Sequence, residues 1–193
     1  MNASPSLYII AGCNGAGKTT ASYTVLPDIL NCKEFVNADE IARGLSPFQP
    51  DRVSFQAGRL MLTRIKTLLA AQEDFALETT LATKSYVSLV KEAQQNGYQV
   101  NLLFFWLNSV ALAIERVALR VQEGGHHIPE AVVRRRCEGG LRNFFGLYQS
   151  LVNSWMLADN SGQSYQIVAR GNTNETTVLD NKSWSVLNNK YYE

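Results

Sequence analysis

The nine residues GCNGAGKTT, at positions 12–20, restrict what this chain can fold into more than any other stretch. Gly12, Gly17, Lys18 and Thr19 satisfy the pattern GxxxxGK(S/T). In that pattern backbone N–H groups wrap a phosphate, the lysine reaches the outer phosphates of a nucleotide, and the hydroxyl holds Mg²⁺. We therefore expect ATP or GTP binding at a turn between a strand and a helix. The expected nucleotide-binding residues are Gly12, Asn14, Gly15, Ala16, Gly17, Lys18, Thr19 and Thr20, with Thr19 also the expected magnesium ligand.

Short apolar runs alternate with helical patterns along the chain. The runs predict five strands, at residues 7–11, 34–38, 75–78, 100–107 and 165–169. Helices are predicted from about residue 17, from residue 51, over 84–95 and 109–123, from 129 to about 152, and around Trp184. The helix from residue 51 has apolar residues near helical spacing, namely Phe55, Leu60, Leu62, Ile65, Leu68 and Leu69. This βαβα order predicts a three-layer α/β fold with a parallel five-stranded sheet.

Two helices occur between the predicted fourth and fifth strands, where one would suffice. Residues 116–142 hold six arginines against three glutamates, a local charge of +3 in a chain of net charge +1. A nucleic-acid surface is not favoured, because aromatic residues are not interleaved until Phe144 and the overall charge is near neutral. The pattern indicates a helical lid over a phosphate site. We expect a single domain over residues 1–193 with this lid inserted at about 116–142.

Composition excludes several classes of protein. The chain has 193 residues, of which 46% are hydrophobic, enough for one sizeable core. No apolar run approaches the ~20 residues that a membrane span requires, and the first residues do not resemble a signal peptide, so we expect a cytoplasmic protein. Cys13, Cys32 and Cys137 form no CxxC pair and are read as buried or incidental thiols.

Acidic residues follow two of the predicted strands. The fourth strand ends in FFWLNS, without the acid typical of motor ATPases, and the NKxD-type guanine-reading motif of GTPases is not found. Instead, Asp39 follows FVNA and Glu78 follows FAL. Both would lie at the carboxyl edge of a parallel sheet, beside the phosphate loop. One carboxylate could take a proton from an acceptor hydroxyl while the other orients the acceptor or a metal-bound water, and the sequence leaves open which is the base. Asp39 could alternatively cap a helix beginning at Glu40.

The arginines of the predicted lid suggest cations for a transferring phosphate. Arg116 and Arg120 are four residues apart and share a helix face. Arg134, Arg135 and Arg136 are consecutive, so at most two of them face the site. Arg120 is the preferred phosphate ligand, whereas Arg116 and Arg142 are read as surface or salt-bridge residues.

Five stretches together resemble the zeta-toxin family of P-loop kinases, in particular its shorter bacterial members. They are GCNGAGKTT, VNADEIARGLSP, FALETTLAT, RVALRVQEGGHHIPEAVVRRR and LADNS, and the resemblance spans about residues 7–170. It implies a 2-3-1-4-5 strand order and ATP-dependent phosphorylation of a sugar hydroxyl on UDP-N-acetylglucosamine. An antitoxin protein is left open as a partner, and the charge pattern and the short apolar runs lead us to expect no nucleic-acid or membrane partner.

The resemblance also implies roles for individual residues. Asp39 matches the general base, Lys18 and Thr19 the P-loop pair, and Arg120 the first lid arginine, while Glu78, with Thr79 and Thr80 beside it, matches the substrate-binding acid. One match fails, because Gly125, His126 and His127 stand where the family's second lid arginine falls. Arg134–Arg136 would replace it from the next helix. The expected function is an ATP- and Mg²⁺-dependent kinase with an alcohol acceptor; the alternatives are a P-loop ATPase and a nucleotide-dependent binding module.

Overall fold

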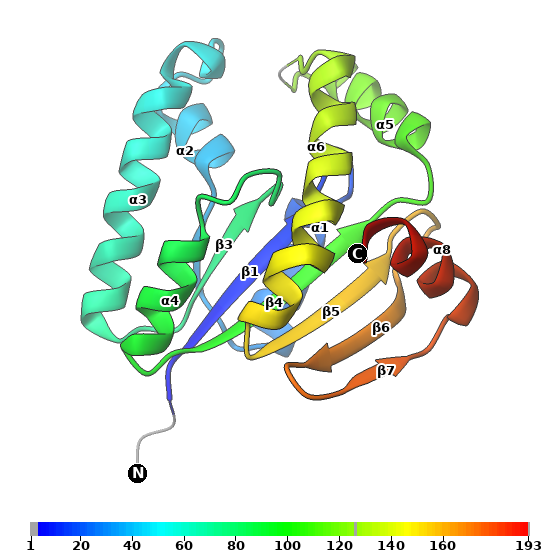
Figure 1. Cartoon of the computed structure of the whole chain (residues 1–193). Coiled ribbons are helices and arrows are strands. Elements are labelled where there is room, and N and C mark those ends of the chain that lie inside the picture. Colours follow the sequence, from blue (N-terminus) through cyan, green and yellow to red (C-terminus); the bar gives the residue numbers. More distant parts are fainter. Residues whose placement is uncertain (1–3, 126, 193) are drawn as a thin grey trace.

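The computed structural model describes residues 4–125 and 127–192, and within them the chain forms one seven-stranded sheet of order β2-β3-β1-β4-β5-β6-β7 (Figure 1). Five neighbouring strands are parallel. They are β1 (Ser6–Gly12), β2 (Glu34–Val36), β3 (Phe75–Thr79), β4 (Gln99–Trp106) and β5 (Ser154–Asp159). The predicted α/β class and the 2-3-1-4-5 order of the parallel strands are confirmed.

The strand predicted at residues 165–169 is present, but it is not the fifth parallel strand. Residues 166–169 belong to β6 (Gln166–Asn172), which is antiparallel to β5 and is followed by the antiparallel strand β7 (Thr176–Val178). The fifth parallel strand is formed by the six residues SWMLAD, over which the sequence predicted no strand. Trp155 of this strand is 3% exposed and stacks on Trp184 at 5.8 Å between ring centroids, so its indole is part of the core.

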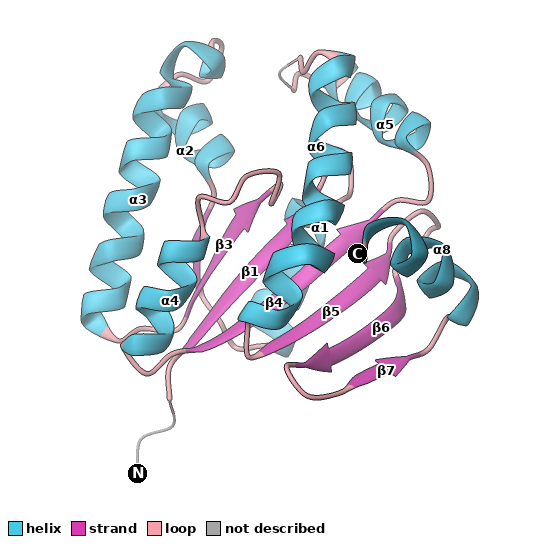
Figure 2. Ribbon diagram, viewed as in Figure 1, coloured by secondary structure: helices cyan, strands magenta, loops and turns pink. Residues whose placement is uncertain are grey.

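Helices cover both faces of the sheet (Figure 2). They are α1 (Lys18–Thr24), α2 (Ala38–Leu45), α3 (Ser54–Ala71), α4 (Val87–Gln95), α5 (Val110–Gln122), α6 (Glu130–Asn143), α7 (Gln149–Leu151) and α8 (Asn181–Tyr191). Three short turns continue or precede them, the π-helical η1 (Val25–Ile29) and η3 (Phe144–Tyr148) and the 3₁₀ turn η2 (Pro50–Val53). Among the described residues, no helix is both long and apolar enough to cross a membrane.

The core is divided by the sheet because successive strand residues point to opposite faces. In β1, Leu7 and Ile9 belong to a cluster with α3, α4, η3 and α8, whereas Ile10 belongs to a cluster with η1, α5 and α6. Leu7, Ile9 and Ile10 are at most 1% exposed, so β1 is buried on both faces. The phosphate loop that follows β1 is therefore anchored at the centre of the molecule.

Helix α3 buries a narrower face than its composition suggests. Ala57, Met61, Ile65 and Leu68 are buried at spacings of three and four residues. Phe55 is 80% exposed, and Leu60 and Leu62 are also exposed, so three of the six apolar residues noted in the sequence lie outside the core. The reason is that α3 packs against α2 and the sheet along one side, while its other side faces solvent.

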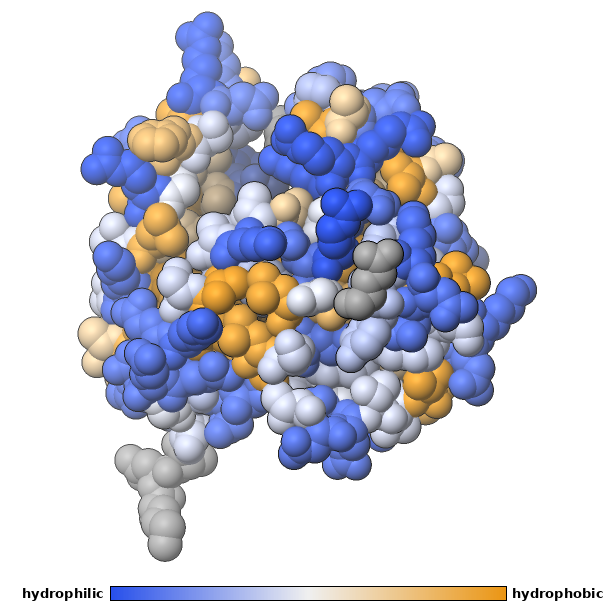
Figure 3. All heavy atoms as spheres, viewed as in Figure 1, coloured by the Kyte–Doolittle hydropathy of each residue, from blue (hydrophilic) through white to orange (hydrophobic). Residues whose placement is uncertain are grey.

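Two helical arms rise above the carboxyl ends of the parallel strands (Figure 1). One consists of α2 and α3, and the other consists of the α5–α6 hairpin. Figure 3 shows the surface hollowed between these arms, with hydrophilic side chains gathered over α6. Because the phosphate loop joins β1 to α1 at the same edge of the sheet, the hollow lies above that loop.

Candidate active site

The phosphate loop connects β1 to α1 and requires glycine at its two ends. Gly12 has φ +139°, and a Cβ there would collide with the carbonyl oxygen of Phe105. Gly17 has φ +78°, and a Cβ there would collide with the side-chain amide of Asn160. Both positions therefore need glycine for its positive φ and for close packing. The predicted strand, turn and helix around this motif are all present.

Lys18 begins α1 and is almost entirely buried, with 6% of the residue exposed. Its ammonium donates a hydrogen bond to the carbonyl oxygen of Cys13 at 3.0 Å and forms an ion pair with Glu78 at 3.5 Å between Nζ and Oε1. A buried ammonium requires such partners, because desolvating a charge is costly. The two contacts hold the lysine side chain across the phosphate loop.

Glu78 connects the phosphate loop to helix α2 through Asn37. Its Oε2 accepts hydrogen bonds from the Thr19 hydroxyl at 2.7 Å and from the Asn37 side-chain amide at 2.9 Å. The side chain of Glu78 is 10% exposed. The carboxylate lies at the end of β3, which pairs directly with β1, so the register Ile10↔Glu78 places it beside the phosphate loop. Glu78 therefore contacts the nucleotide-binding residues Lys18 and Thr19.

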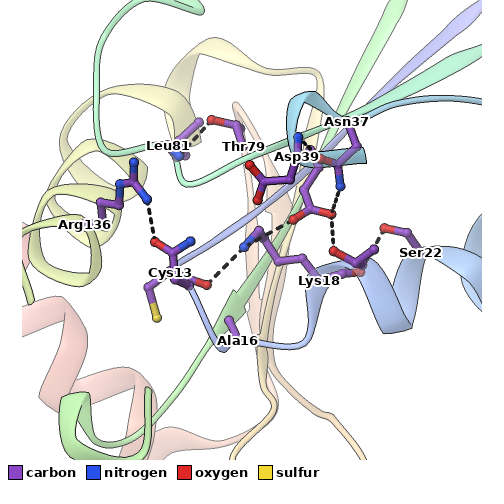
Figure 4. A network of polar contacts seen from close by, with 12 residues as sticks. Cys13, Ala16, Lys18, Ser22, Asn37, Asp39, Thr79, Leu81 and Arg136 are labelled. Carbon is purple, nitrogen blue, oxygen red and sulfur yellow. Dashed lines mark hydrogen bonds and ion pairs between the residues drawn. The ribbon is translucent and has the colours of Figure 1, made fainter. Parts of the chain in front are cut away.

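Asp39 lies in the first turn of α2 and is not the residue that caps this helix. The cap is Asn37, whose Oδ1 accepts a hydrogen bond from the Asp39 backbone N–H at 2.8 Å. The alternative interpretation of Asp39 as a cap for a helix from Glu40 is therefore wrong. Asp39 is exposed, and within the described residues its carboxylate forms no ion pair. Figure 4 shows Lys18, Asn37 and Asp39 on one side of the phosphate loop.

Arg120 lies near the end of α5, and part of its guanidinium is buried without a partner. Its Nε and Nη2 atoms are inaccessible to solvent and have no hydrogen-bond acceptor within the described part of the chain. The Gly125 N–H donates to the Arg120 carbonyl oxygen at 2.8 Å, and a Cβ on Gly125 would approach Arg120 Cγ to 2.8 Å. The turn after α5 is thus folded back onto Arg120, and only a residue without a side chain fits there.

The arginines of α6 separate into different environments. Arg136 reaches the phosphate loop, where its Nη1 donates to Asn14 Oδ1 at 2.9 Å, from the side opposite Asp39 in Figure 4. Arg134 pairs with Glu130 one turn earlier at 2.6 Å, and both side chains are 57% exposed. Arg135 is exposed and forms no ion pair with any described residue. Arg142 pairs with Glu138 at 3.6 Å, so its reading as a salt-bridge residue agrees with its position.

Arg116 is half-buried rather than on the surface, and it binds a turn after β5. Its guanidinium donates to the carbonyl oxygens of Asn160 at 2.8 Å and Ser161 at 3.2 Å. The side chain of Asn160 in turn donates to the Ala16 carbonyl oxygen at 2.8 Å. Asp159 holds the same turn by accepting from the N–H and hydroxyl of Ser161. This turn, residues 159–161, therefore supports the phosphate loop through the hydrogen bond from Asn160 to Ala16.

Two buried thiols link the phosphate loop to α6. A hydrogen bond with Cys137 is the main cause that lowers the pKa of the Cys13 thiol, against the effect of burial. The same hydrogen bond, together with burial, raises the pKa of the Cys137 thiol. Cys13, Cys32 and Cys137 are all buried and free, as the sequence predicts.

The oxygen atoms at this site suit a hard divalent cation. Mg²⁺ is usually bound by one or two protein oxygens, with the remaining ligands from phosphates and water. The Thr19 hydroxyl and the Glu78 carboxylate supply such oxygens side by side. Among the described residues, no group of three or more His, Cys, Asp and Glu forms a site that would hold a metal by protein ligands alone. The donor set therefore fits a cation that arrives with a nucleotide.

Sequence reasoning missed Asn37 and Asn160 as parts of the site. Asn37 carried a signal, since asparagine directly before a helix is a favoured cap. Asn160 lies in the LADNS stretch, but its contact with Ala16 joins residues 144 positions apart, which no local pattern reveals. His127 is exposed and His126 lies outside the described residues.

Comparisons with known proteins agree with this architecture. A family model described as zeta toxin matches residues 1–172. An uncharacterised protein of Haemophilus influenzae is 30% identical over 125 residues, which cover 65% of this chain and 87% of that protein.

Solved structures show a similar fold at low sequence identity. A chain in the crystal structure of AvrRxo1-ORF1:-ORF2 with ATP is 16% identical with a TM-score of 0.77, over 96% of this chain and 64% of that one. The present chain thus spans less than two thirds of that neighbour's length. A chain of the PezAT toxin-antitoxin system of Streptococcus pneumoniae is 15% identical with a TM-score of 0.68, over 99% of this chain and 79% of that one.

Proposed function

The chain belongs to the zeta toxin family, and we propose that it is an ATP- and Mg²⁺-dependent kinase that transfers a phosphoryl group to the hydroxyl of a small molecule. The AvrRxo1 neighbour was crystallised with ATP, which supports ATP as the donor. A gluconokinase from Sinorhizobium meliloti also has a similar fold, with a TM-score of 0.53.

One continuous chain of contacts carries this proposal. Thr19 donates to Glu78 at 2.7 Å, Asn37 donates to the same oxygen at 2.9 Å, and Asn37 accepts from the Asp39 N–H at 2.8 Å. A motif that holds phosphates is thereby connected to the first turn of α2, which carries the exposed Asp39. Phosphoryl transfer to an alcohol needs this combination of a donor site and a proton acceptor at a fixed separation.

The two carboxylates are assigned different roles by their surroundings. Glu78 is held by Lys18, Thr19 and Asn37, so it belongs to the nucleotide and metal side of the site. We assign it, with the Thr19 hydroxyl, to holding Mg²⁺, because a P-loop hydroxyl and a nearby acid share that task in other P-loop proteins. Asp39 is exposed and its carboxylate forms no ion pair with any described residue, which favours Asp39 as the general base. Magnesium, when bound, neutralises charge on the β- and γ-phosphates.

These positions support the following proposed reaction. Asp39 accepts the proton of the acceptor hydroxyl, whose oxygen forms a bond to the γ-phosphorus as the bond from that phosphorus to the β,γ-bridging oxygen breaks. ADP leaves with the electrons of the broken bond. Lys18 and Arg120 provide positive charge for the phosphate oxygens, and such cations are the main catalytic contribution in this chemistry.

The α5–α6 hairpin is proposed to act as a lid, inserted at about 116–142 in a single domain. Arg120 and Arg136 lie on its two helices, and Arg136 contacts the phosphate loop through Asn14. For the acceptor, we propose a nucleotide sugar, with UDP-N-acetylglucosamine as the compound to test first. Because PezAT is a toxin-antitoxin system, a protein antitoxin is proposed as a partner.

ATP consumption tests this function directly. We expect turnover to depend on an acceptor from a panel of nucleotide sugars, nucleosides and neutral sugars, and a phosphate ester to be visible in the phosphorus NMR spectrum of the product. Asp39→Asn should abolish the acceptor-dependent part of the ATP turnover. Turnover that needs no acceptor and is unchanged in Asp39→Asn would refute the kinase and favour an ATPase, while tight ATP binding without turnover would favour a binding module.

Arg120→Ala provides a second test with a matched control. We expect a loss of at least ~10²-fold in kcat because a cation on the transferring phosphate is removed. Arg134→Ala removes the same charge from a side chain that is 57% exposed and paired with Glu130, so its kcat should remain near that of the unchanged protein. Equal effects of the two substitutions would contradict the assignment of Arg120.

A further inference from the structure

Two thiols lie where the phosphate loop meets helix α6. Cys13 is the second residue of the loop, Cys137 lies in the middle of α6, and their side chains form a hydrogen bond. Both side chains line one cavity of about 160 Å³. The residues beside them in the chain are also in contact, because Arg136 donates to Asn14 Oδ1 at 2.9 Å. Two adjacent contacts therefore hold the loop and the helix together at this point.

The two thiols differ in reactivity. The hydrogen bond with Cys137 is the main cause that lowers the pKa of the Cys13 thiol, and the charges of Lys18 and Arg116 lower it further, against the effect of burial. The same hydrogen bond raises the pKa of Cys137, which is therefore the thiol that keeps its proton. Because the thiolate is the nucleophilic form, Cys13 is the sulfur that attacks an electrophile. Cys137 is then placed to react with the oxidised Cys13.

Cys32 provides an internal comparison. Its Sγ donates to the carbonyl oxygen of Glu34 at 3.6 Å, and burial raises the pKa of this thiol to about 11. Cys32 is not among the described residues that line the cavity. A buried thiol with a raised pKa is inert, so Cys32 is the natural control for the other two cysteines.

The cavity gives a small oxidant access to the two sulfurs. Cys13 and Cys137 are 6% and 8% exposed, so a reagent reaches them through the cavity rather than at the outer surface. Asn108 and Val186 line the same cavity and are exposed to solvent. Its volume is several times what one water molecule requires, so a molecule of the size of hydrogen peroxide fits inside.

We propose that Cys13 and Cys137 form an oxidative modification site, at which hydrogen peroxide converts the two thiols to a disulfide that weakens nucleotide binding. The Cys13 thiolate attacks one peroxide oxygen, the O–O bond breaks, and the released hydroxide takes up a proton and leaves as water. Cys13 is then a sulfenic acid. The Cys137 sulfur attacks the Cys13 sulfur, the S–O bond breaks, and the hydroxide leaves as water with the Cys137 proton. The cysteines lose two electrons in total, and the peroxide is reduced to two molecules of water.

The disulfide acts on the phosphate loop through the backbone of Cys13. An S–S bond of about 2.05 Å is shorter than a hydrogen bond between two thiols, so its formation draws Cys13 and α6 together. The Cys13 carbonyl oxygen accepts from Lys18 Nζ at 3.0 Å and from the Ala16 N–H at 3.1 Å. A shift of Cys13 therefore moves the acceptor that holds both Lys18 and the turn of the loop. The effect on ATP rests on the proposed function, whereas the formation of the disulfide does not.

Peptide mapping tests the disulfide on the unchanged protein. Trypsin cleaves after lysine and arginine, so the three cysteines fall on separate peptides, Cys13 on one that ends at Lys18, Cys32 on 19–33 and Cys137 on 137–142. After treatment with hydrogen peroxide and blocking of free thiols, we expect the first and third peptides to be linked, and dithiothreitol to separate them. Cys32 should remain a free thiol. Absence of the Cys13–Cys137 link, or linkage of Cys32 as often as of Cys137, would overturn the proposal.

ATP affinity provides the second arm, measured by calorimetry on the reduced and the oxidised form of each protein. We expect oxidation to weaken binding by about tenfold or more, as for loss of a hydrogen bond to a charged group, and dithiothreitol to restore it. Cys137→Ala should bind ATP equally before and after peroxide treatment, whereas Cys32→Ala should respond to peroxide as the unchanged protein does.

Each variant is compared with its own reduced form, so an effect of the substitution on packing or stability does not enter the ratio of affinities. Equal affinity of the oxidised and reduced forms of the unchanged protein, or an equal loss of affinity in Cys137→Ala, would overturn the effect of the disulfide on nucleotide binding. The two proposals fail separately. A reduced protein that does not bind ATP would refute the nucleotide site, while the peptide map still decides whether the thiol pair is oxidised.

Discussion

The side-chain amide of Asn160 donates a hydrogen bond to the carbonyl oxygen of Ala16 at 2.8 Å, which joins the turn after β5 to the middle of the phosphate loop. Arg116 holds the same turn through the carbonyl oxygens of Asn160 and Ser161. Because Arg116 belongs to α5, the helical hairpin and the phosphate loop are connected through this turn. The position of the helical hairpin thus affects the shape of the phosphate loop.

Asn160→Ala should weaken nucleotide binding. The substitution leaves the partly buried Ala16 carbonyl without its donor, which costs about 1 kcal/mol, or about fivefold in the Kd of ATP. We expect the effect in KM for ATP rather than in KM for the acceptor, measured by initial rates together with ATP titration. Asn189→Ala on the exposed side of α8 serves as the control and should change neither constant. A rise confined to the acceptor KM would contradict a role in supporting the phosphate loop.

Glu78→Gln should impair magnesium use. The amide keeps the shape and one acceptor oxygen for Thr19 and Asn37, but the negative charge facing Lys18 is lost. We expect a loss of at least ~10²-fold in turnover at low magnesium and partial recovery as magnesium is raised, because a carboxylate is the preferred ligand. The measurement is ATP turnover across a magnesium titration. A change in acceptor KM with unchanged magnesium dependence would instead place Glu78 at the acceptor.

Asn37→Ala should reduce both stability and activity. The variant loses the cap of α2 and a hydrogen bond to Glu78, and loss of such a cap costs about 1 kcal/mol in the free energy of unfolding. Urea unfolding measures the first effect and ATP turnover the second. Asp180→Ala removes the cap of α8, remote from the phosphate loop, and should lower stability while leaving turnover unchanged. If Asn37→Ser restores the cap but not the turnover, the contact with Glu78 is the functional one.

The free energy of unfolding should depend on pH through the Glu138 carboxyl. Burial acts to raise the pKa of this carboxyl, but hydrogen bonds from Tyr191 and Lys190 outweigh it and lower the pKa on folding. A group whose pKa falls on folding stabilises the protein above its unfolded pKa, near 4.3 for glutamate, and that stabilisation is lost as pH falls through the folded value. Glu138→Gln should therefore be less stable than the unchanged protein at pH 7, and the difference should shrink below about pH 4. A difference in unfolding free energy that is constant between pH 3 and pH 7 would exclude this linkage.

Local patterns in the sequence were sufficient for the phosphate loop and most of the sheet. The motif at residues 12–20 needs only its own glycines, lysine and threonine, and short apolar runs identified β1 to β4. The run in β5 was missed because it follows closely on the long helix that continues through η3 and α7. Its role as a strand depends on pairing with β4, which is a tertiary contact.

The sequence by itself determined the phosphate-binding motif, the α/β class and the residue types available for catalysis, because these depend on neighbours within a few positions. Only the tertiary structure decided how those residues are used. Parallel pairing of β1 with β3 placed Glu78 on Lys18 and Thr19, and packing of α6 brought Arg136 to Asn14 but left Arg134 with Glu130. The physical reason is that hydrogen bonds and ion pairs act over a few ångströms, and folding alone brings together atoms that are distant in the chain.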